Sequence, residues 1–462
     1  MNLENFVITG SSSLREALNR INLNKHGLVF VSCEGDTVKG VVTDGDIRRH
    51  LLNKGGMEDA ILTCTNKEFH WEKWGTPREL LLKKLDGRVR AIPLLDESRR
   101  LVGVFSREHA PLSSEESIYA RARSPVRVSF AGGGSDLTHY FADNGGGAVI
   151  NATISLYSHA LLRLRTNRTI AIHSQDLGET LEARDLPEAL SMRGTFGLVQ
   201  ALLKLINPDF GFELYLHSDY PLKSGLGGSA VVSAAILGCF NQFRRDQWDS
   251  YELAEIAYQA ERLHLGVAGG WQDQYATVFG GINFMEFRME QNLIHPLRIQ
   301  AETLLELEES LVLCDSGIAH ESGEIHEDQR VQMSDDKMRD QVAENAQLSY
   351  DMRNALLRGK LRDFGLLLDQ AWQAKRRVSK KISSLKLDAI YDSAKQHGAL
   401  GGKLLGAGGG GFFLFYAPPY QKHALLSHLK SNGLSAQSFR FEERGLQAWT
   451  VRESKNQPMA PL

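Results

Sequence analysis

The pattern of apolar and polar positions divides the chain into a short N-terminal part and a longer remainder. Within 1–112, an apolar strand, a polar turn and a second strand occur twice, at 27–47 and at 91–110. A helical stretch precedes each copy, at 14–21 and at 77–85. The polar segment 113–118 is typical of a short linker. This part is therefore predicted to be a module with an internal repeat.

Beyond the linker, strand-like and helix-like segments occur in mixed blocks, which is typical of an α+β fold. The expected strands are 126–131, 148–154, 156–165, 169–173, 212–217, 283–287, 310–314, 403–405, 412–416, 437–441 and 446–451. The expected helices are 196–206, 229–240, 251–264, 338–357, 361–374, 385–396 and 421–429. The tail 456–462 is expected to lack regular structure.

One stretch combines three glycines with the start of a small-residue, apolar helix. Residues 223–229 read Lys-Ser-Gly-Leu-Gly-Gly-Ser. Glycines permit close backbone approach, and a helix N-terminus attracts anions, so we expect a nucleotide phosphate here. The stretch is not a Walker A motif, and no acidic residue is placed as in a dinucleotide fingerprint. The alternative is a tight loop before a core helix, without a ligand.

Two more glycine-rich stretches, 124–137 and 403–413, flank this loop in the sequence. In this order and with these separations, the three resemble the motifs of the GHMP small-molecule kinases. Residues 268–275 (Ala-Gly-Gly-Trp-Gln-Asp-Gln-Tyr) and 280–287 resemble the D-glycero-D-manno-heptose 7-phosphate kinase branch. The resemblance covers about 119–455. It implies the GHMP kinase fold, with an S5-like half at 119–310 and a ferredoxin-like half at 311–455.

The resemblance also implies an activity: transfer of the ATP γ-phosphoryl group, with Mg²⁺, to the anomeric hydroxyl of D-glycero-D-manno-heptose 7-phosphate or a similar sugar. The product would supply nucleotide-activated heptose synthesis. By motif position, Asp273 is the expected base and Arg127 the cation beside it. Ser229 and Glu261 are the expected metal ligands. The residues expected to bind ATP are Lys223, Ser224, Gly225, Leu226, Gly227, Gly228, Ser229, Gly408 and Gly409. Those expected to bind the sugar are Gly133, Gly134, Ser135 and Asp136.

These residue types suit phosphoryl transfer, which needs phosphates cradled, Mg²⁺ held, a hydroxyl placed and charge neutralised. A carboxylate such as Asp273 can accept the hydroxyl proton, and Arg127 would keep it ionised. Structural alternatives remain: Asp273 in an Asx turn, Arg127 on an exposed strand, and Glu261 on a solvent-facing helix. Gly228 departs from the family's frequent serine, so one phosphate contact is expected to be missing.

The N-terminal repeat resembles a CBS-domain pair at 1–112. That resemblance implies a regulatory adenosine nucleotide whose ribose contacts Thr43 and Asp46. The second repeat has Ser106 and His109 instead, so one nucleotide site is expected. Because CBS pairs commonly stack, a homodimer is also expected. The alternative is a dimerising module without a ligand, in which Asp46 simply caps a helix.

Composition excludes several other classes of function. The net charge of −3 gives no general attraction to nucleic acid or to an anionic membrane, and no apolar run approaches a membrane span. The four cysteines form no CxxC spacing, and the N-terminus lacks a basic signal region, so a cytoplasmic protein is expected. Two rivals stay open: another sugar-1-kinase, for L-fucose or galactose, and a non-catalytic nucleotide sensor. The exact sugar is not determined by these patterns.

Overall fold

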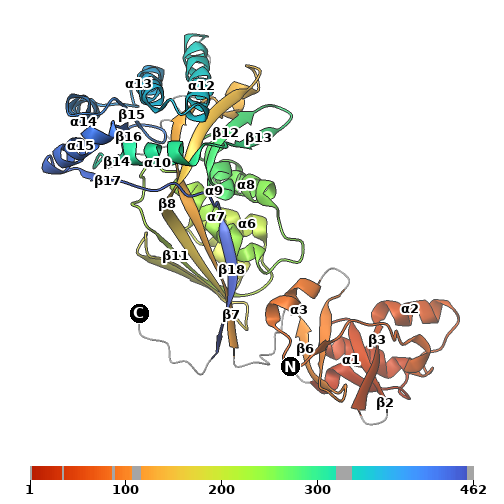
Figure 1. Ribbon diagram of the computed structural model, residues 1–462. Helices are drawn as coiled ribbons and strands as arrows, with labels where there is room; N and C mark the ends of the chain where they lie inside the picture. Colours follow the sequence, from red (N-terminus) through yellow and green to blue (C-terminus); the bar gives the residue numbers. More distant parts are fainter. Residues whose placement is uncertain (1–2, 34–35, 86–88, 107–115, 319–335, 455–462) are drawn as a thin grey trace.

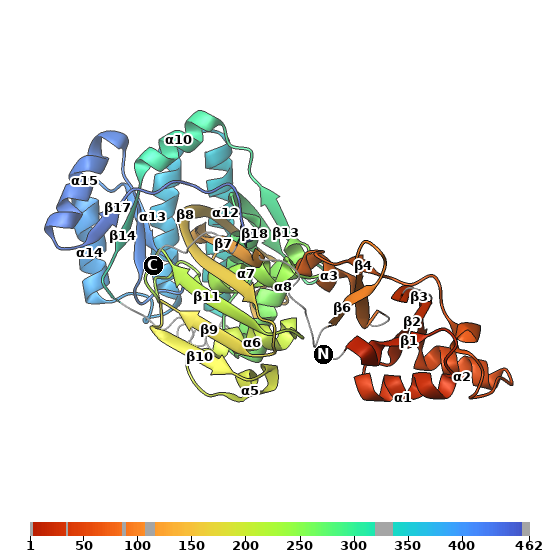
Figure 2. The same cartoon turned by 90° about the horizontal axis from the view of Figure 1, so that it is seen from below.

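The computed structural model describes residues 3–33, 36–85, 89–106, 116–318 and 336–454. The predicted tail and the first half of the predicted linker, 113–115, lie outside these residues, and 116–118 belong to a strand. In both Figure 1 and Figure 2, residues 3–106 lie to one side of the rest of the chain. Within the described residues, no helix has the length and apolar character needed to cross a bilayer.

The N-terminal part contains the same three-stranded sheet twice, which confirms the internal repeat. In each copy the first two strands are parallel and the third is antiparallel to the second. The strands are β1 (Val7–Thr9), β2 (Leu28–Cys33), β3 (Thr37–Thr43), β4 (Glu72–Lys73), β5 (Ala91–Leu95) and β6 (Leu101–Ser106). The helices are α1 (Leu14–Asn24), α2 (Asp44–Leu52) and α3 (Arg78–Lys84).

A shared hydrophobic core joins the two repeats. Phe30 of β2 and Val38 of β3 belong to one buried cluster with Leu95 of β5 and Val104 of β6. β5 is buried along its whole length and β2 along all but its last residue, which explains their continuous apolar sequences. Because both copies contribute to one cluster, residues 3–106 pack as one module.

The larger part of the chain is built on an eight-stranded sheet with β8 (Gly147–Leu164) at its centre. β7 (Glu116–Ala131) pairs with one edge of β8, while β11 (Phe212–Ser218) and β12 (Ile282–Phe287) share the other. The remaining strands are β9 (Ile170–Ser174), β10 (Glu179–Ala183), β13 (Asn292–Pro296) and β18 (Gln447–Ser454).

Two details of this sheet differ from the sequence-based expectation. The separate strands expected at 148–154 and 156–165 form one continuous strand, β8. Its pairing with β7 shifts register between Pro125 and Val126, where Ser155 and Leu156 of β8 form a bulge. The last strand of the chain also joins this sheet, since β18 pairs antiparallel with β7. The boundaries 119–310 and 311–455 of the two kinase halves stay a prediction. The eight-stranded sheet is built mainly from residues 119–310, but its strand β18 comes from 311–455.

Helix α7 (Gly228–Asn241) packs against β7 and β8 and is buried from Ala230 to Asn241 except at Val232. Burial on all sides explains why its sequence is apolar all round. Figure 1 shows α6 (Gly197–Ile206), α8 (Ser250–Gln259) and α9 (Gln272–Phe279) grouped beside it on the same face of the sheet. The short helices α4 (Thr138–Phe141) and α5 (Leu186–Ser191) complete this half.

The C-terminal half is a second, antiparallel sheet with helices. Its strand order is β15 (Gly401–Leu404), β16 (Phe412–Tyr416), β14 (Leu311–Asp315), β17 (Ser435–Gln437). The helices are α10 (Ala301–Ser310), α12 (Asp336–Leu357), α13 (Leu361–Val378), α14 (Leu385–Gln396) and α15 (Pro419–Ser431). Helix α12 also packs on β8, which joins the two halves. Two mixed units of this kind confirm the α+β class.

Candidate active site

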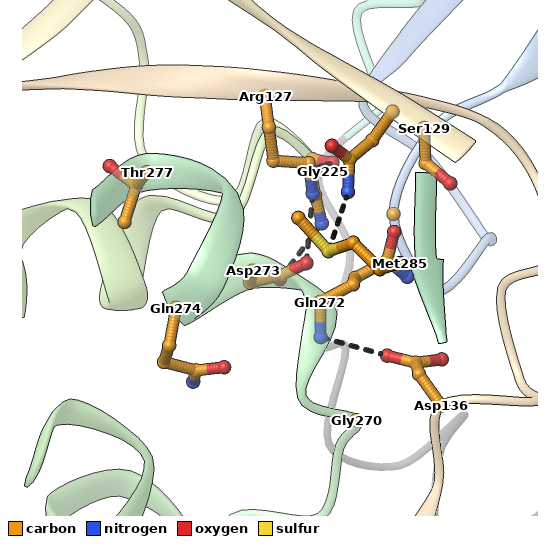
Figure 3. A network of polar contacts seen from close by, with 12 residues as sticks. Arg127, Ser129, Asp136, Gly225, Gly270, Gln272, Asp273, Gln274, Thr277 and Met285 are labelled. Atoms are coloured by element: carbon orange, nitrogen blue, oxygen red, sulfur yellow. Dashed lines mark hydrogen bonds and ion pairs between the residues drawn. The ribbon is translucent and has the colours of Figure 1, made fainter. Parts of the chain in front are cut away.

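A cavity of about 540 Å³ lies between the two halves of the larger part of the chain. Its wall includes the loop 133–136, the glycine loop 223–229 and residues 406–407, so all three glycine-rich stretches reach it. One part of the wall is apolar, formed by side chains such as Phe196, Val199 and Leu216. Another part is polar, and the contacts around Arg127, Asp136 and Asp273 in it are shown in Figure 3.

The glycine loop turns sharply into α7. Gly225 and Gly227 have φ angles of +77° and +81°, which residues with side chains rarely adopt. A Cβ atom on Gly227 would lie 3.3 Å from both the guanidinium carbon of Arg127 and Oδ2 of Asp273. Glycine is therefore required for the backbone to pass so close to these charges. The first residues of α7 line the cavity, so the helix N-terminus would attract an anion there.

Arg127 and Asp273 form a two-point ion pair at the polar end of the cavity (Figure 3). Nε and Nη2 of Arg127, on β7, donate to Oδ1 and Oδ2 of Asp273, each at 2.8 Å. Nη1 donates to the carbonyl oxygen of Gly225 at 2.7 Å. Asp273 lies in the first turn of α9, not in the Asx turn weighed as its structural alternative. Its carboxylate is consequently held both by a helix and by a buried guanidinium.

Ser229 and Glu261, the predicted metal ligands, both line the cavity, and the Ser229 hydroxyl is near enough to oppose the rise in the pKa of Glu261. Glu261 is buried on a π-helical turn (Ala260–His264) that continues α8, so the predicted helix 251–264 changes from α-helical to π-helical geometry there. Burial raises the pKa of Glu261, and Arg262, 3.3 Å from Oε1, opposes that shift. Gln274 donates to Oε2 at 2.9 Å.

This arrangement fits a Mg²⁺ ion that takes two ligands from the protein and the others from water and phosphate. The hydroxyl and the carboxylate supply two hard oxygen donors beside the glycine loop, as Mg²⁺ prefers. Across the part of the chain that the structure describes, no cluster of three or more His, Cys, Asp or Glu side chains could hold a metal.

Asp136 is almost fully buried at the edge of the cavity, with 2% of its surface exposed. Its Oδ1 accepts from the N–H of Gly134 at 3.0 Å, and its Oδ2 from the N–H of Gln272 at 3.1 Å. Burial raises the pKa of Asp136, and the nearby charge of Asp273 adds to the rise while these hydrogen bonds oppose it. The carboxylate is thus already bonded to two backbone segments.

Two buried lysines that sequence reasoning missed also line the cavity. Nζ of Lys403, on β15, donates to the carbonyl oxygen of Ser129 at 2.9 Å. Nζ of Lys375, on α13, donates to that of Leu404 at 3.0 Å. Burial lowers the pKa of Lys403 to about 7 and that of Lys375 well below its usual range. Lys403 is the first residue of the third glycine motif, so its place in the sequence could have indicated a site residue. Lys375 belongs to a basic run that is typical of a surface helix, so the sequence gives no such indication for it.

Comparisons with known proteins agree with this geometry. The GHMP kinases N terminal domain matches residues 195–281 and the GHMP kinases C terminal family matches 352–433. A curated relative from Campylobacter jejuni, D-glycero-alpha-D-manno-heptose 7-phosphate kinase, is 35% identical over 337 residues, which cover 72% of this chain and 99% of the relative. This chain belongs to the GHMP kinase family. It is accordingly a sugar kinase, a phosphotransferase that acts on a sugar hydroxyl.

Solved structures give the same fold for this GHMP kinase. The crystal structure of a D-glycero-D-manno-heptose 1-phosphate kinase from Bacteroides thetaiotaomicron has 28% identity and a TM-score of 0.60, covering 72% of this chain and 99% of the other. Lactococcus lactis galactokinase, solved with galactose, has 20% identity and a TM-score of 0.58, covering 71% and 95%. The second likeness shows the fold alone. The S5-like and ferredoxin-like halves of the family fold are therefore present here.

Most of the predicted site residues of this kinase meet at the cavity, but four do not line it. Leu226 is buried in the core, and its carbonyl oxygen accepts from the N–H of Arg127. The hydroxyl of Ser135 bonds to backbone atoms of Gly132 and Ala148. Gly408 and Gly409 pack against Ile382, whose carbonyl oxygen accepts from the N–H of Gly409 at 2.8 Å. Gly406 and Ala407 line the cavity instead.

In the N-terminal part, a CBS domain matches residues 1–53. Thr43 and Asp46 form a reciprocal capping box at the start of α2, and Asp46 is also paired with Arg49. This is the capping role weighed as the alternative to nucleotide binding. Ser106, the second-repeat counterpart, lies 3.2 Å from Nε2 of His26, and His109 lies outside the described residues. The nucleotide site at Thr43 and Asp46 stays a prediction.

Proposed function

We propose that this chain is an ATP- and Mg²⁺-dependent kinase that phosphorylates the anomeric hydroxyl of D-glycero-D-manno-heptose 7-phosphate. The observation that carries the proposal is the Arg127–Asp273 pair directly beneath the glycine loop. In support of the proposal, the Asp273 carboxylate lies beside the N-terminus of α7 in a cavity of about 540 Å³, within the usual size range of ligand sites. The 35% identical relative supplies the choice of sugar. The product would enter nucleotide-activated heptose synthesis.

In this proposal the chemistry depends mainly on positioning and on electrostatics. The acceptor hydroxyl oxygen bonds to the γ-phosphorus while the bond from that phosphorus to the bridging oxygen of ADP breaks. Asp273 takes the hydroxyl proton, and Arg127 holds its carboxylate in a fixed orientation. The N–H groups at the start of α7 face the phosphates.

Ser229 and Glu261 are the side chains that would hold Mg²⁺ in this proposal. When bound, Mg²⁺ neutralises phosphate charge and orients the phosphate chain. The buried amino groups of Lys375 and Lys403 lie near the same place, and a bound polyphosphate would favour their charged form. The apolar wall around Phe196 and Val199 would receive the base of the nucleotide.

The test is ATP turnover with D-glycero-D-manno-heptose 7-phosphate, L-fucose, D-galactose and no sugar, under matched conditions. Phosphorus NMR of the product identifies the phosphorylated hydroxyl. We expect the heptose 7-phosphate to have the highest kcat/KM and to gain an anomeric phosphate. Faster turnover of L-fucose or galactose would assign another sugar, and ADP formation independent of every sugar would count against a sugar kinase of this specificity.

A further inference from the structure

The N-terminus of helix α9, which carries Asp273, is held by a carboxylate from a distant part of the chain. The first N–H groups of a helix have no partners within the helix and need an acceptor from elsewhere. Among the described residues, the N-cap residue Trp271 supplies no side-chain cap. Oδ2 of Asp136 accepts from the N–H of Gln272, the first residue of α9, at 3.1 Å (Figure 3). A negative charge at this end also suits the helix dipole.

The segment before α9 lies directly against this carboxylate. A Cβ atom on Gly270 would be 1.9 Å from Oδ2 of Asp136, so only glycine allows the approach. The N–H of Trp271 donates to the carbonyl oxygen of Asp136 at 3.3 Å. Asp136 therefore contacts three consecutive residues, and its other oxygen is bonded to the N–H of Gly134. Each oxygen of the Asp136 carboxylate is therefore held by a backbone N–H group.

A second anchor ties the same segment to the loop that contains Asp136. Nε1 of Trp271 donates to Oγ1 of Thr138 at 2.9 Å. The indole ring stacks on Tyr258 with ring centroids 3.5 Å apart and an interplanar angle of 7°. The hydroxyl of Tyr258 lies 3.2 Å from the same Thr138 oxygen. The start of α9 is thus held through both the backbone and the side chain of Trp271.

From these contacts we propose that Asp136 is a positioning residue, which sets the start of α9 and thereby the place of the Asp273 carboxylate opposite Arg127. Asp273 is the second residue of the helix, so a shift of its first turn moves the base directly. The proposal rests on the proposed function, because it assumes that Asp273 is the base. The proposal adds that the loop 133–136, which lines the cavity, also fixes the position of Asp273.

The first experiment compares Asp136→Asn with the wild type, using the sugar that the wild type turns over fastest. Asparagine keeps one acceptor oxygen and replaces the other by a donor, so one of the two N–H groups loses its partner. We expect kcat to fall by about 10- to 100-fold, since small misplacements of reacting groups cost this much. The KM for sugar should change less than about threefold if positioning dominates. A raised sugar KM with unchanged kcat would overturn the proposal.

The second experiment uses Thr138, which is not among the residues that line the cavity. Thr138→Val removes the second anchor, whereas Thr138→Ser keeps the oxygen. We expect a severalfold lower kcat for valine, restored by serine, with the same sugar KM in both. Equal kcat in the valine and serine variants would contradict the proposal.

Hydrogen exchange of the peptide that contains residues 271–279 gives a readout that needs no sugar. We expect faster exchange at the start of α9 in Asp136→Asn and in Thr138→Val than in the wild type. Unchanged exchange in both variants would overturn the positioning role even if the sugar assignment is right. Conversely, a wrong sugar assignment would leave this measurement unaffected, so the two failures can be told apart.

Discussion

Arg127 and Asp273 are 146 positions apart in the sequence, yet they share two parallel hydrogen bonds of 2.8 Å. The guanidinium comes from a sheet strand and the carboxylate from the first turn of a helix. A bidentate pair of this kind fixes the orientation of both groups. The predictions below follow from this pair, from the neighbouring oxygen ligands, from the buried lysines and from the N-terminal module.

Asp273→Asn should keep ATP binding and lower kcat by at least about 100-fold, because an amide cannot accept the hydroxyl proton. Initial rates and calorimetric titration with ATP measure the two properties separately. Asp246→Asn is a matched control, since that carboxylate is exposed and forms an ion pair with Arg244 away from the cavity. Near-normal turnover of Asp273→Asn would remove Asp273 from the role of base.

Ser229→Ala combined with Glu261→Gln should raise the Mg²⁺ concentration for half-maximal activity by about tenfold or more. Even the loss of outer-shell partners weakens metal sites 10- to 100-fold, and both proposed protein ligands are removed here. The measurement is a Mg²⁺ titration of activity at fixed ATP, with Glu255→Gln on α8 as the control. If the titration curves coincide, other groups hold the metal.

Lys403→Met should weaken the dependence of stability on pH. The pKa of Lys403 is lowered to about 7 in the folded protein by burial, with the charge of Arg127 adding to the effect. Between pH 7 and the ordinary lysine range, the unfolded chain binds the extra proton, so the free energy of unfolding rises with pH. One such group contributes at most about 1.4 kcal/mol per pH unit.

Urea unfolding of the full chain at pH 7, 8 and 9 tests this expectation. The wild type should gain more stability with rising pH than Lys403→Met. Lys375 is also buried with a lowered pKa, so the variant should retain part of the dependence. An identical slope in both proteins would show that the Lys403 amino group carries its charge in the folded state at neutral pH.

AMP should change the kinase activity of the full chain about five- to a hundredfold, the range of typical couplings between two sites. Asp46→Ala should abolish this response. Because Asp46 also caps α2, Ser13→Ala is the matched control, which removes the cap of α1 in the same module. If AMP leaves wild-type activity unchanged and fails to bind at millimolar concentration, the module has no such regulatory site.

Size-exclusion chromatography with light scattering tests the expected homodimer.

Local sequence determined the parts of this protein that depend on a few neighbouring residues. The apolar run after Ser229 predicted α7, and the glycines before it predicted the sharp loop, because positive φ angles need glycine. The order of the three glycine motifs indicated the kinase family, and the family comparisons confirm it. The repeated strand pattern likewise predicted the N-terminal repeat, which the two small sheets confirm.

Tertiary structure decided which polar groups meet. Gly408 and Gly409 belong to the predicted motif, yet the fold turns them toward Ile382 and brings Gly406 to the cavity. Lys375 reads as a surface lysine until α13 packs its amino group against Leu404. Asp136 and Gln272 meet only because the loop after β7 and the start of α9 converge. A hydrogen bond between distant segments depends on where the whole chain places two atoms, and no local pattern carries that information.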